Sequence, residues 1–340
     1  MEVINSGKLS QYVSMEVLKN KGTATGACIL IGLGYVALLY APALFLPQPK
    51  SAQEHMLRRF ACSLVASVLA PFICLTILPV DVQWDSDYVT LLKMFGLSTS
   101  HMWQVAVMSI LLTAILYLGP LVLDLLDFVS WCIDDITISG QPSLLIEHLW
   151  SAMVYHGKIL ASDVFWWRTF LVAPLSEELV FRVCMVPVLL CGGFSPSAVV
   201  FICPMFFALA HIHHFWDLVH KQRHAISKAA YIVGLQLGYT TIFGWYATFL
   251  YLRTGNLIAP LVAHMFCNTM GLPDIGAAIS SPHHRSVIMA YFAGVVGFFA
   301  LLGPVTDPSF YNENPITEDC SCWLGYCKWR SLGKTGMSSL

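Results

Sequence analysis

The chain has 340 residues, of which 57% are hydrophobic and 11% are charged. Soluble globular domains carry about 25% charged residues, so this composition excludes an ordinary soluble fold and predicts a polytopic membrane protein. The formal net charge of −2 leaves no basic surplus for a nucleic-acid partner, and we expect none.

Five segments are long and apolar enough to cross a membrane as helices, because a hydrocarbon core of about 30 Å needs roughly 20 residues. They are 25–46, 60–80, 102–123, 229–252 and 287–305. Three further apolar segments, at 169–190, 195–212 and 257–272, are interrupted by polar groups. We therefore expect an all-α fold of about eight transmembrane helices that enclose a polar intramembrane cavity.

The same pattern predicts how the chain is divided. We expect an N-terminal tail at 1–24, a transmembrane domain at 25–305 with a motif-bearing core at 160–272, and a C-terminal tail at 306–340. Leu144, Leu149 and Met153 recur at helical spacing among polar residues, which is typical of an amphipathic helix at the membrane interface.

Cysteines fall into two groups. Those within the apolar segments are expected to act as small buried hydrophobic side chains. The cluster Cys320, Cys322 and Cys327 in the C-terminal tail lacks the spacing of a zinc site, and we interpret it as a site of acylation.

Ionisable residues lie within the three interrupted segments, where a charge at mid-bilayer costs about 2.5–3.5 kcal/mol and therefore indicates a functional site. Glu178 and Arg182 are four residues apart on one helix face and can neutralise each other. Glu177 points about 100° away from Glu178 around the helix. It therefore needs a partner or a water molecule from another helix.

Candidate partners of Glu177 lie on the other two segments. His211 ends the second segment, four residues after Phe207, and His264 and Asn268 are four residues apart on the third. A carboxylate and an imidazole can activate water, while imidazole N–H and amide donors can stabilise an oxyanion. Together these side chains suit the hydrolysis of an amide. Taken singly, each His or Asn also fits a structural hydrogen bond between helices.

Two alternatives stay open at this point. His211, His213, His214, His264 and Glu177 offer ligands that suit zinc, although the sequence contains no H-E-x-x-H motif. The polar residues are also compatible with a non-catalytic membrane scaffold that they hold together. We predict a site without a metal or another cofactor.

The histidines of the segment 213–228 are left outside the site. This segment reads as a polar loop, in which histidines are solvated by default. They are His213, His214, His220 and His224.

Three short motifs occur in order on the interrupted segments: Glu177-Glu178-x-x-x-Arg182, Phe207-x-x-x-His211 and His264-x-x-x-Asn268. Together they resemble the type II CAAX prenyl endopeptidases, within the wider family of CAAX proteases and bacteriocin-processing proteins. The resemblance implies a multi-pass protease of the endoplasmic reticulum membrane that uses no cofactor. It would remove the last three residues of farnesylated or geranylgeranylated CAAX proteins of the small-GTPase type, with membrane lipid around it.

The resemblance also implies roles for individual residues. Glu177 would be the catalytic glutamate and His211 its partner in activating water. His264 and Asn268 would stabilise the oxyanion. Glu178 and Arg182 match the motif, and their spacing leads us to expect that they shape the site.

Overall fold

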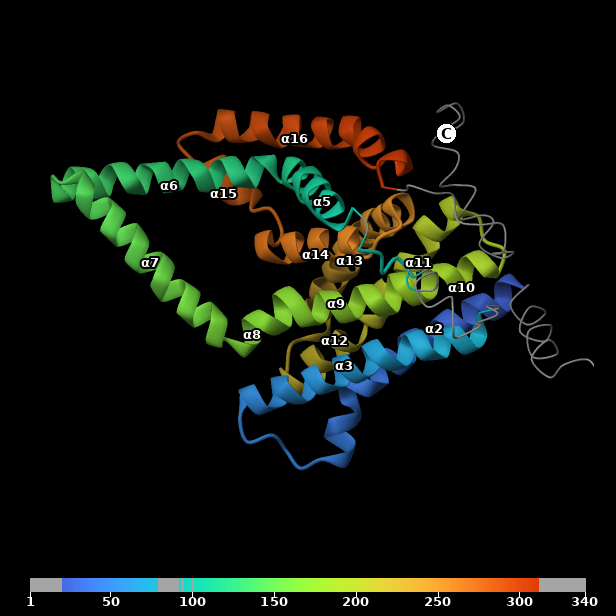
Figure 1. The fold of residues 1–340 in the computed structure, drawn as a ribbon. Helices are drawn as coiled ribbons and strands as arrows, with labels where there is room; N and C mark the ends of the chain where they lie inside the picture. Colours follow the sequence, from blue (N-terminus) through green and yellow to red (C-terminus); the bar gives the residue numbers. More distant parts are fainter. Residues whose placement is uncertain (1–19, 79–91, 93–94, 100, 312–340) are drawn as a thin grey trace, which may run out of the picture.

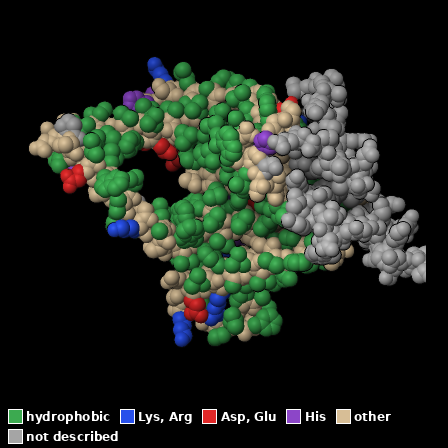
Figure 2. All heavy atoms as spheres, in the orientation of Figure 1, with side chains coloured by type: hydrophobic (Ala, Val, Ile, Leu, Met, Phe, Trp, Pro, Cys, Tyr) green, Lys and Arg blue, Asp and Glu red, His purple; other side chains and the backbone are tan. Residues whose placement is uncertain are grey.

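Helices make up the regular structure of the described chain. A computed structural model describes residues 20–78, 92, 95–99 and 101–311, and within these residues no strand occurs. Figure 1 shows most of the helices gathered in a bundle, from which two long helices extend to one side. Hydrophobic side chains cover much of the described part of the face seen in Figure 2, and charged side chains form small separate groups there. The all-α fold predicted from the sequence is confirmed.

Four helical stretches are long and apolar enough to cross a membrane. They are α2 (Lys21–Phe45), α3 (Ala52–Ile77), Pro196–Lys221, which includes α11 (Pro196–Ala210) and α12 (His213–Trp216), and α16 (His284–Val305). A fifth crossing is formed if α5 (Met102–Leu116) and α6 (Leu118–Ser139) count as one bent span. A multi-pass membrane architecture is therefore confirmed.

The other predicted segments are also helical, but each departs from a simple span. The predicted helix at 229–252 lies within α13 (Ile226–Thr254), which is long enough but less apolar. The segment at 257–272 forms α14 (Ile258–Met270), a helix of 13 residues. The segment at 169–190 is divided among short α-helical and π-helical stretches. These three segments explain why four or five spans are found where about eight helices were expected.

The predicted helix at 102–123 bends by 80° between α5 and α6. Pro120 lies four residues after Leu116, so it cannot donate to the Leu116 carbonyl and its ring clashes with that group. Gly119 lies against the ring of Tyr291, where a Cβ would come within 2.3 Å of the ring carbons. The segment 102–123, predicted as one helix, is therefore divided between two helices in the structure.

Beyond this bend, α6 leads to α7 (Pro142–Ser162), the long diagonal helix of Figure 1. The predicted amphipathic helix lies in α7, and none of its described side chains is buried in the protein. Its position at a membrane interface stays a prediction. The tails at 1–24 and 306–340, and the cysteine cluster with the second tail, fall largely or wholly outside the described residues.

Several helix starts follow from local capping. The Asn20 side chain accepts from the Gly22 N–H at 2.9 Å at the start of α2. Ser51 and Ser195 cap α3 and α11, with hydroxyl-to-amide distances of 3.0 and 3.3 Å. Each cap satisfies an amide that the first turn of a helix leaves without a partner.

The helical rod that carries Glu177 contains two π-helical turns. In order it consists of α8 (Val164–Trp167), a π-helical turn at Arg168–Val172, α9 (Ala173–Glu178), a second π-helical turn at Leu179–Cys184, and α10 (Met185–Cys191). π-Helical turns in longer helices are frequent at functional sites. Here they lie directly before and after the helical segment with the two glutamates.

Three buried cysteine thiols from α2, α3 and α11 contact backbone carbonyls of this rod. Cys203 of α11 donates to the Phe181 carbonyl at 3.0 Å, and Cys74 of α3 donates to the Cys184 carbonyl at 3.3 Å. Cys28 of α2 contacts the Met185 carbonyl at 3.9 Å. All three cysteines are free and buried, as predicted for cysteines in apolar segments.

The packing of α11 on α13 positions His211 at the C-terminal end of α11. Gly244 of α13 lies against Pro204 of α11, and a Cβ on Gly244 would come within 2.5 Å of the Pro204 Cβ. Proline is rigid, so an added methyl group can be relieved only by moving one of the helices. A glycine at this position therefore allows the close approach of α11 and α13.

We predict that Gly244→Ala destabilises the protein by about 1–3 kcal/mol, the range for overpacking. Gly234→Ala on the same helix is the matched control, because a Cβ there meets nothing within 4 Å. That control should be neutral or gain up to about 1 kcal/mol from helix propensity. Thermal unfolding of both variants in detergent measures the difference, and equal melting temperatures would contradict the close-approach argument.

Candidate active site

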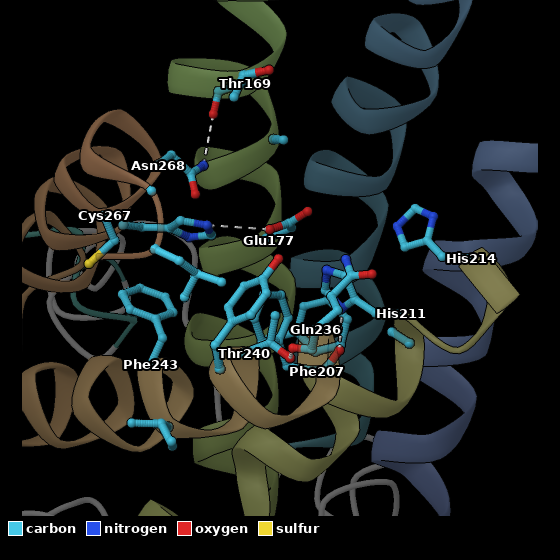
Figure 3. Close-up of a pocket in the computed structure, with 18 of the residues that line it drawn as sticks. Thr169, Glu177, Phe207, His211, His214, Gln236, Thr240, Phe243, Cys267 and Asn268 are labelled. Carbon is cyan, nitrogen blue, oxygen red and sulfur yellow. Dashed lines mark hydrogen bonds and ion pairs between the residues drawn. The ribbon is translucent and has the colours of Figure 1, made fainter. Parts of the chain in front are cut away.

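A cavity of about 730 Å³ lies among the helices at the centre of the bundle. Glu177, His211, His264 and Asn268, the four residues predicted to carry the chemistry, all line it. Figure 3 shows Glu177, His211 and Asn268 reaching into the same space from three different helices. The structure therefore brings the predicted residues together in one cavity, where they lie beside apolar and aromatic side chains.

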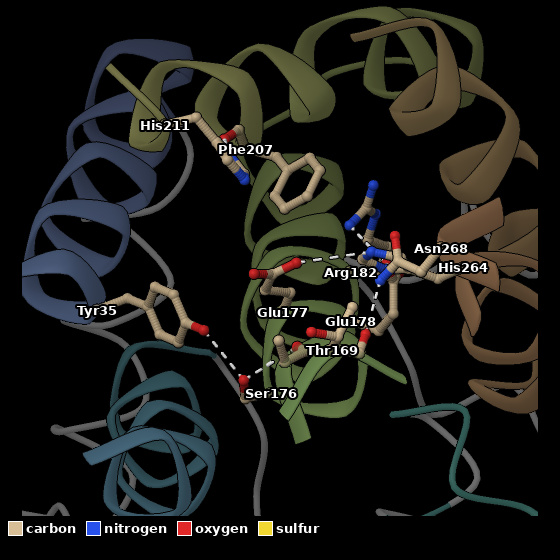
Figure 4. A network of polar contacts seen from close by, with 11 residues as sticks. Tyr35, Thr169, Ser176, Glu177, Glu178, Arg182, Phe207, His211, His264 and Asn268 are labelled. Carbon is tan, nitrogen blue, oxygen red and sulfur yellow. Dashed lines mark hydrogen bonds and ion pairs between the residues drawn. The ribbon is translucent and has the colours of Figure 1, made fainter. Parts of the chain in front are cut away.

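Behind the cavity lies a buried ionic cluster of Glu178, Arg182 and His264 (Figure 4). Arg182 Nη1 donates to Glu178 Oε1 at 3.0 Å, and both side chains are 0% exposed. His264 Nδ1 donates to the same oxygen at 2.7 Å. The expected Glu178–Arg182 pair is present, and His264 joins it from α14.

Aromatic rings complete the surroundings of Arg182. Its guanidinium lies 4.6 Å from the ring centre of Phe207 and 5.8 Å from that of Phe243. Arg182 Nε and Nη2 have no hydrogen-bond partner among the described residues, so the ring faces supply attraction where hydrogen bonds do not. Phe207 of the second motif is thus a structural contact of the cluster.

Glu177 faces the cavity, and its side chain is 18% exposed. Its Oε2 lies 3.7 Å from Nε2 of His264, so the imidazole ring stands between two consecutive glutamates. Since Nδ1 donates to Glu178, Nε2 carries a hydrogen only in the imidazolium form. The partner from another helix that Glu177 was expected to need is His264.

His211 and Asn268 are each oriented by a backbone carbonyl. His211 Nδ1 donates to the Phe207 carbonyl at 2.8 Å, which leaves Nε2 of the neutral ring as a proton acceptor. Asn268 Nδ2 donates to the Thr169 carbonyl at 2.9 Å. An amide nitrogen carries two hydrogens, so Asn268 keeps one for another acceptor.

The interpretation of residues 213–228 as a polar loop was wrong for residues 213–221, and two of the histidines left outside the site line the cavity. His213 and His214 line the cavity, because residues 213–221 continue as α12 and a π-helical turn instead of a loop. The sequence could have predicted this position for His214. It is three residues after His211, and on a helix residues three apart lie on a similar face. The sequence reasoning also missed Tyr35, Arg59 and Arg168, which line the cavity as well.

The possible zinc ligands share the cavity without converging. His211, His213, His214, His264 and Glu177 are all in its wall. Within the described ranges, no group of three or more His, Cys, Asp or Glu side chains is arranged to hold a metal ion.

Comparison with known proteins shows the family. Residues 160–270, which contain all three motifs, match the family described as type II CAAX prenyl endopeptidase Rce1-like. The chain is 43% identical over 311 residues to CAAX prenyl protease 2 of Arabidopsis thaliana, covering 90% of this chain and 96% of that protein. The chain belongs to the CAAX prenyl protease 2 family. The resemblance read from the three motifs is confirmed.

Other members of the CAAX prenyl protease 2 family match over different lengths. The human protein is 35% identical over 291 residues, which is 85% of this chain and 83% of the relative. The Schizosaccharomyces pombe protein, named probable CAAX prenyl protease 2, is 34% identical over 58% of this chain and 66% of its own length. No solved structure gives a significant match.

We predict that Glu178→Gln destabilises this family member by about 3–5 kcal/mol, because it leaves the buried Arg182 charge uncompensated. Adding Arg182→Met should recover part of the loss, since the second change removes that charge. Glu54→Gln is the control, as Glu54 and Arg58 form an ion pair of the same i, i+4 spacing at the surface. Thermal unfolding in detergent should show no change for the control. Equal effects of the two glutamine variants would reject the buried cluster as a source of stability.

Proposed function

We propose that the protein is an intramembrane endopeptidase that removes the C-terminal tripeptide from farnesylated or geranylgeranylated CAAX proteins. The observation that carries this proposal is the cavity, in which a member of the CAAX prenyl protease 2 family gathers Glu177, His211, His264 and Asn268. The proposed chemistry uses these side chains and a water molecule, without a cofactor.

In the first step, Glu177 and His211 activate the water. The Glu177 carboxylate takes a proton from it, and His211 Nε2 orients it by accepting its second hydrogen. The Phe207 carbonyl supports this role because it holds the Nδ1 hydrogen of His211 and directs the lone pair of Nε2 away from the backbone. The resulting hydroxide attacks the carbonyl carbon of the scissile amide.

In the second step, His264 and Asn268 stabilise the oxyanion that forms on the carbonyl oxygen. Asn268 offers its remaining amide hydrogen, and the imidazolium form of His264 offers Nε2–H. Glu178 and Arg182 position His264 through the 2.7 Å bond to Nδ1. They act through another residue and do not touch the substrate.

In the third step, the proton held by Glu177 passes to the nitrogen of the leaving peptide. The C–N bond breaks, the carbonyl is restored as the carboxylic acid of the prenylated cysteine, and Glu177 returns to its carboxylate form. The products are the shortened prenylated protein and a free tripeptide.

The surroundings of the site suit a lipid-modified substrate. A prenyl chain partitions into the bilayer, so a protease with its cavity between membrane helices can meet the scissile bond without drawing the lipid into water. We propose small-GTPase-type CAAX proteins as substrates, membrane lipid as a second contact, and the endoplasmic reticulum membrane as the location of this multi-pass protein.

We predict that Glu177→Ala lowers the release of the tripeptide from a farnesylated CAAX peptide by about 10²–10⁴-fold, because both proton transfers pass through the lost carboxylate. The assay uses purified protein in detergent, with monodispersity and melting temperature as folding checks. Glu147→Ala in α7 is the control, since Glu147 is exposed and lies outside the cavity lining. It should keep wild-type turnover.

A zinc chelator separates the remaining alternatives in the same assay. If Glu177 activates the water without a metal, the rate of tripeptide release should be unchanged by the chelator. Loss with chelator and recovery with added zinc would support the metalloprotease. A well-folded wild type that cleaves nothing would support the scaffold.

We predict that Asn268→Leu lowers kcat by about 10²–10³-fold with little change in KM, the pattern for loss of one oxyanion donor. Leucine has a similar shape and cannot donate. Thr269→Val is the matched control, because the adjacent Thr269 is exposed and its hydroxyl donates to the Met265 carbonyl of its own helix. Steady-state kinetics test both variants, and a change confined to KM would argue against an oxyanion role.

A further inference from the structure

The cavity wall contains two arginines that the catalytic steps do not use. Arg59 comes from α3 and Arg168 from the π-helical turn at Arg168–Val172. Both side chains are half-buried. Arg59 lies close enough to His213 and His214 to act on them electrostatically, and Arg168 acts in the same way on Tyr35. All three of these neighbours line the cavity too.

Neither guanidinium makes an ion pair or a hydrogen bond with another described residue. The neighbouring Arg58 is different, because it donates to Glu54 at 2.5 Å and to the Pro47 carbonyl at 2.5 Å. Glu177 is the one carboxylate among the described residues of the cavity wall. Two permanent positive charges therefore face one carboxylate, which makes the cavity receptive to an added anion.

The two arginines lie toward the same end of the cavity. α3 runs parallel to the rod from α8 to α10, because contacts between them follow the same order along both helices. Ser63 and Ser176 both lie at the Tyr35 hydroxyl, and further along Cys74 contacts the Cys184 carbonyl. Arg59 precedes Ser63, and Arg168 precedes Ser176. Both arginines are therefore displaced from the level of Glu177 toward the N-terminal ends of their helices.

This displacement fits the length of the peptide that is released. Arg168 is nine residues before Glu177, which corresponds to about 13 Å along a helix at 1.5 Å per residue. Three extended residues span at most about 10–11 Å from the scissile bond to the terminal carboxylate. The long, flexible side chain of an arginine can bridge the remainder.

We propose that Arg59 and Arg168 form a subsite that binds the C-terminal carboxylate of the substrate. The proposal rests on the endopeptidase function argued above, and it explains how the protein would recognise a chain end whatever the three side chains are. A guanidinium donates two parallel hydrogen bonds to a carboxylate, so it fixes both the charge and the direction of the peptide. With the carboxylate held there, the third peptide bond from the end lies at Glu177.

The test compares a farnesylated CAAX peptide that ends in a free carboxylate with the same peptide ending in an amide. For the wild type, we expect kcat/KM for the acid to exceed that for the amide by about 10- to 100-fold, the range for one hydrogen-bonded charge pair. Arg59→Gln and Arg168→Gln should each lower this ratio, and the double variant should bring it to about 1. Arg58→Gln is the matched control and should keep the wild-type ratio.

The ratio is an internal control, because a general loss of folded enzyme lowers the rates for both peptides equally. Arg59→Lys and Arg168→Lys are measured beside the glutamine variants, and they should lose only part of the ratio since lysine keeps the charge without the planar fork. A wild-type ratio near 1, or a wild-type ratio retained in the double variant, would overturn the subsite. A folded wild type that cleaves neither peptide would reject the endopeptidase function, and the subsite with it.

Discussion

Burial of the Glu178–Arg182 pair is the constraint on which the rest of the site depends. Both side chains are 0% exposed, and removing two charges from water is costly unless each is well partnered. His264 from α14 supplies a second donor to Glu178, and Phe207 from α11 supplies a ring face to Arg182. These contacts to the buried pair therefore join three helices at the wall of the cavity.

Two consecutive glutamates have different environments because a helix turns them to different sides. Glu178 faces the protein interior and its Oε1 accepts from two donors, whereas Glu177 faces the cavity and stays 18% exposed. His264 contacts both through opposite nitrogens of one ring. The buried glutamate thereby sets which nitrogen of the histidine faces the exposed one, and a structural ion pair becomes part of how the proposed chemistry is positioned.

The spacing of residues along a helix predicted the parts of the site that lie within one helix. The i, i+4 spacing gave the Glu178–Arg182 pair, and it separated Glu177 from them. It could not give the bond from His264 to Glu178, because that depends on how two helices 86 residues apart are placed. Hydropathy likewise found the helices but not the 80° bend before Pro120 or the helical continuation at His213. Backbone geometry, which hydropathy does not report, decided the shape of both stretches.

The bond between His264 and Glu178 can form only late in the synthesis of the chain, because His264 follows Glu178 by 86 residues. The rod with Glu177, Glu178 and Arg182 leaves the ribosome well before α14, yet each charge is expensive in lipid without its partners. Cys28 and Cys74 precede the rod and can contact it at once, while Cys203 follows it within 22 residues and His264 only after 86. Until residue 264 has been made, Glu178 can rely only on Arg182 of its own helix, so the contact that joins α14 to the rod is among the last long-range contacts of the site to form.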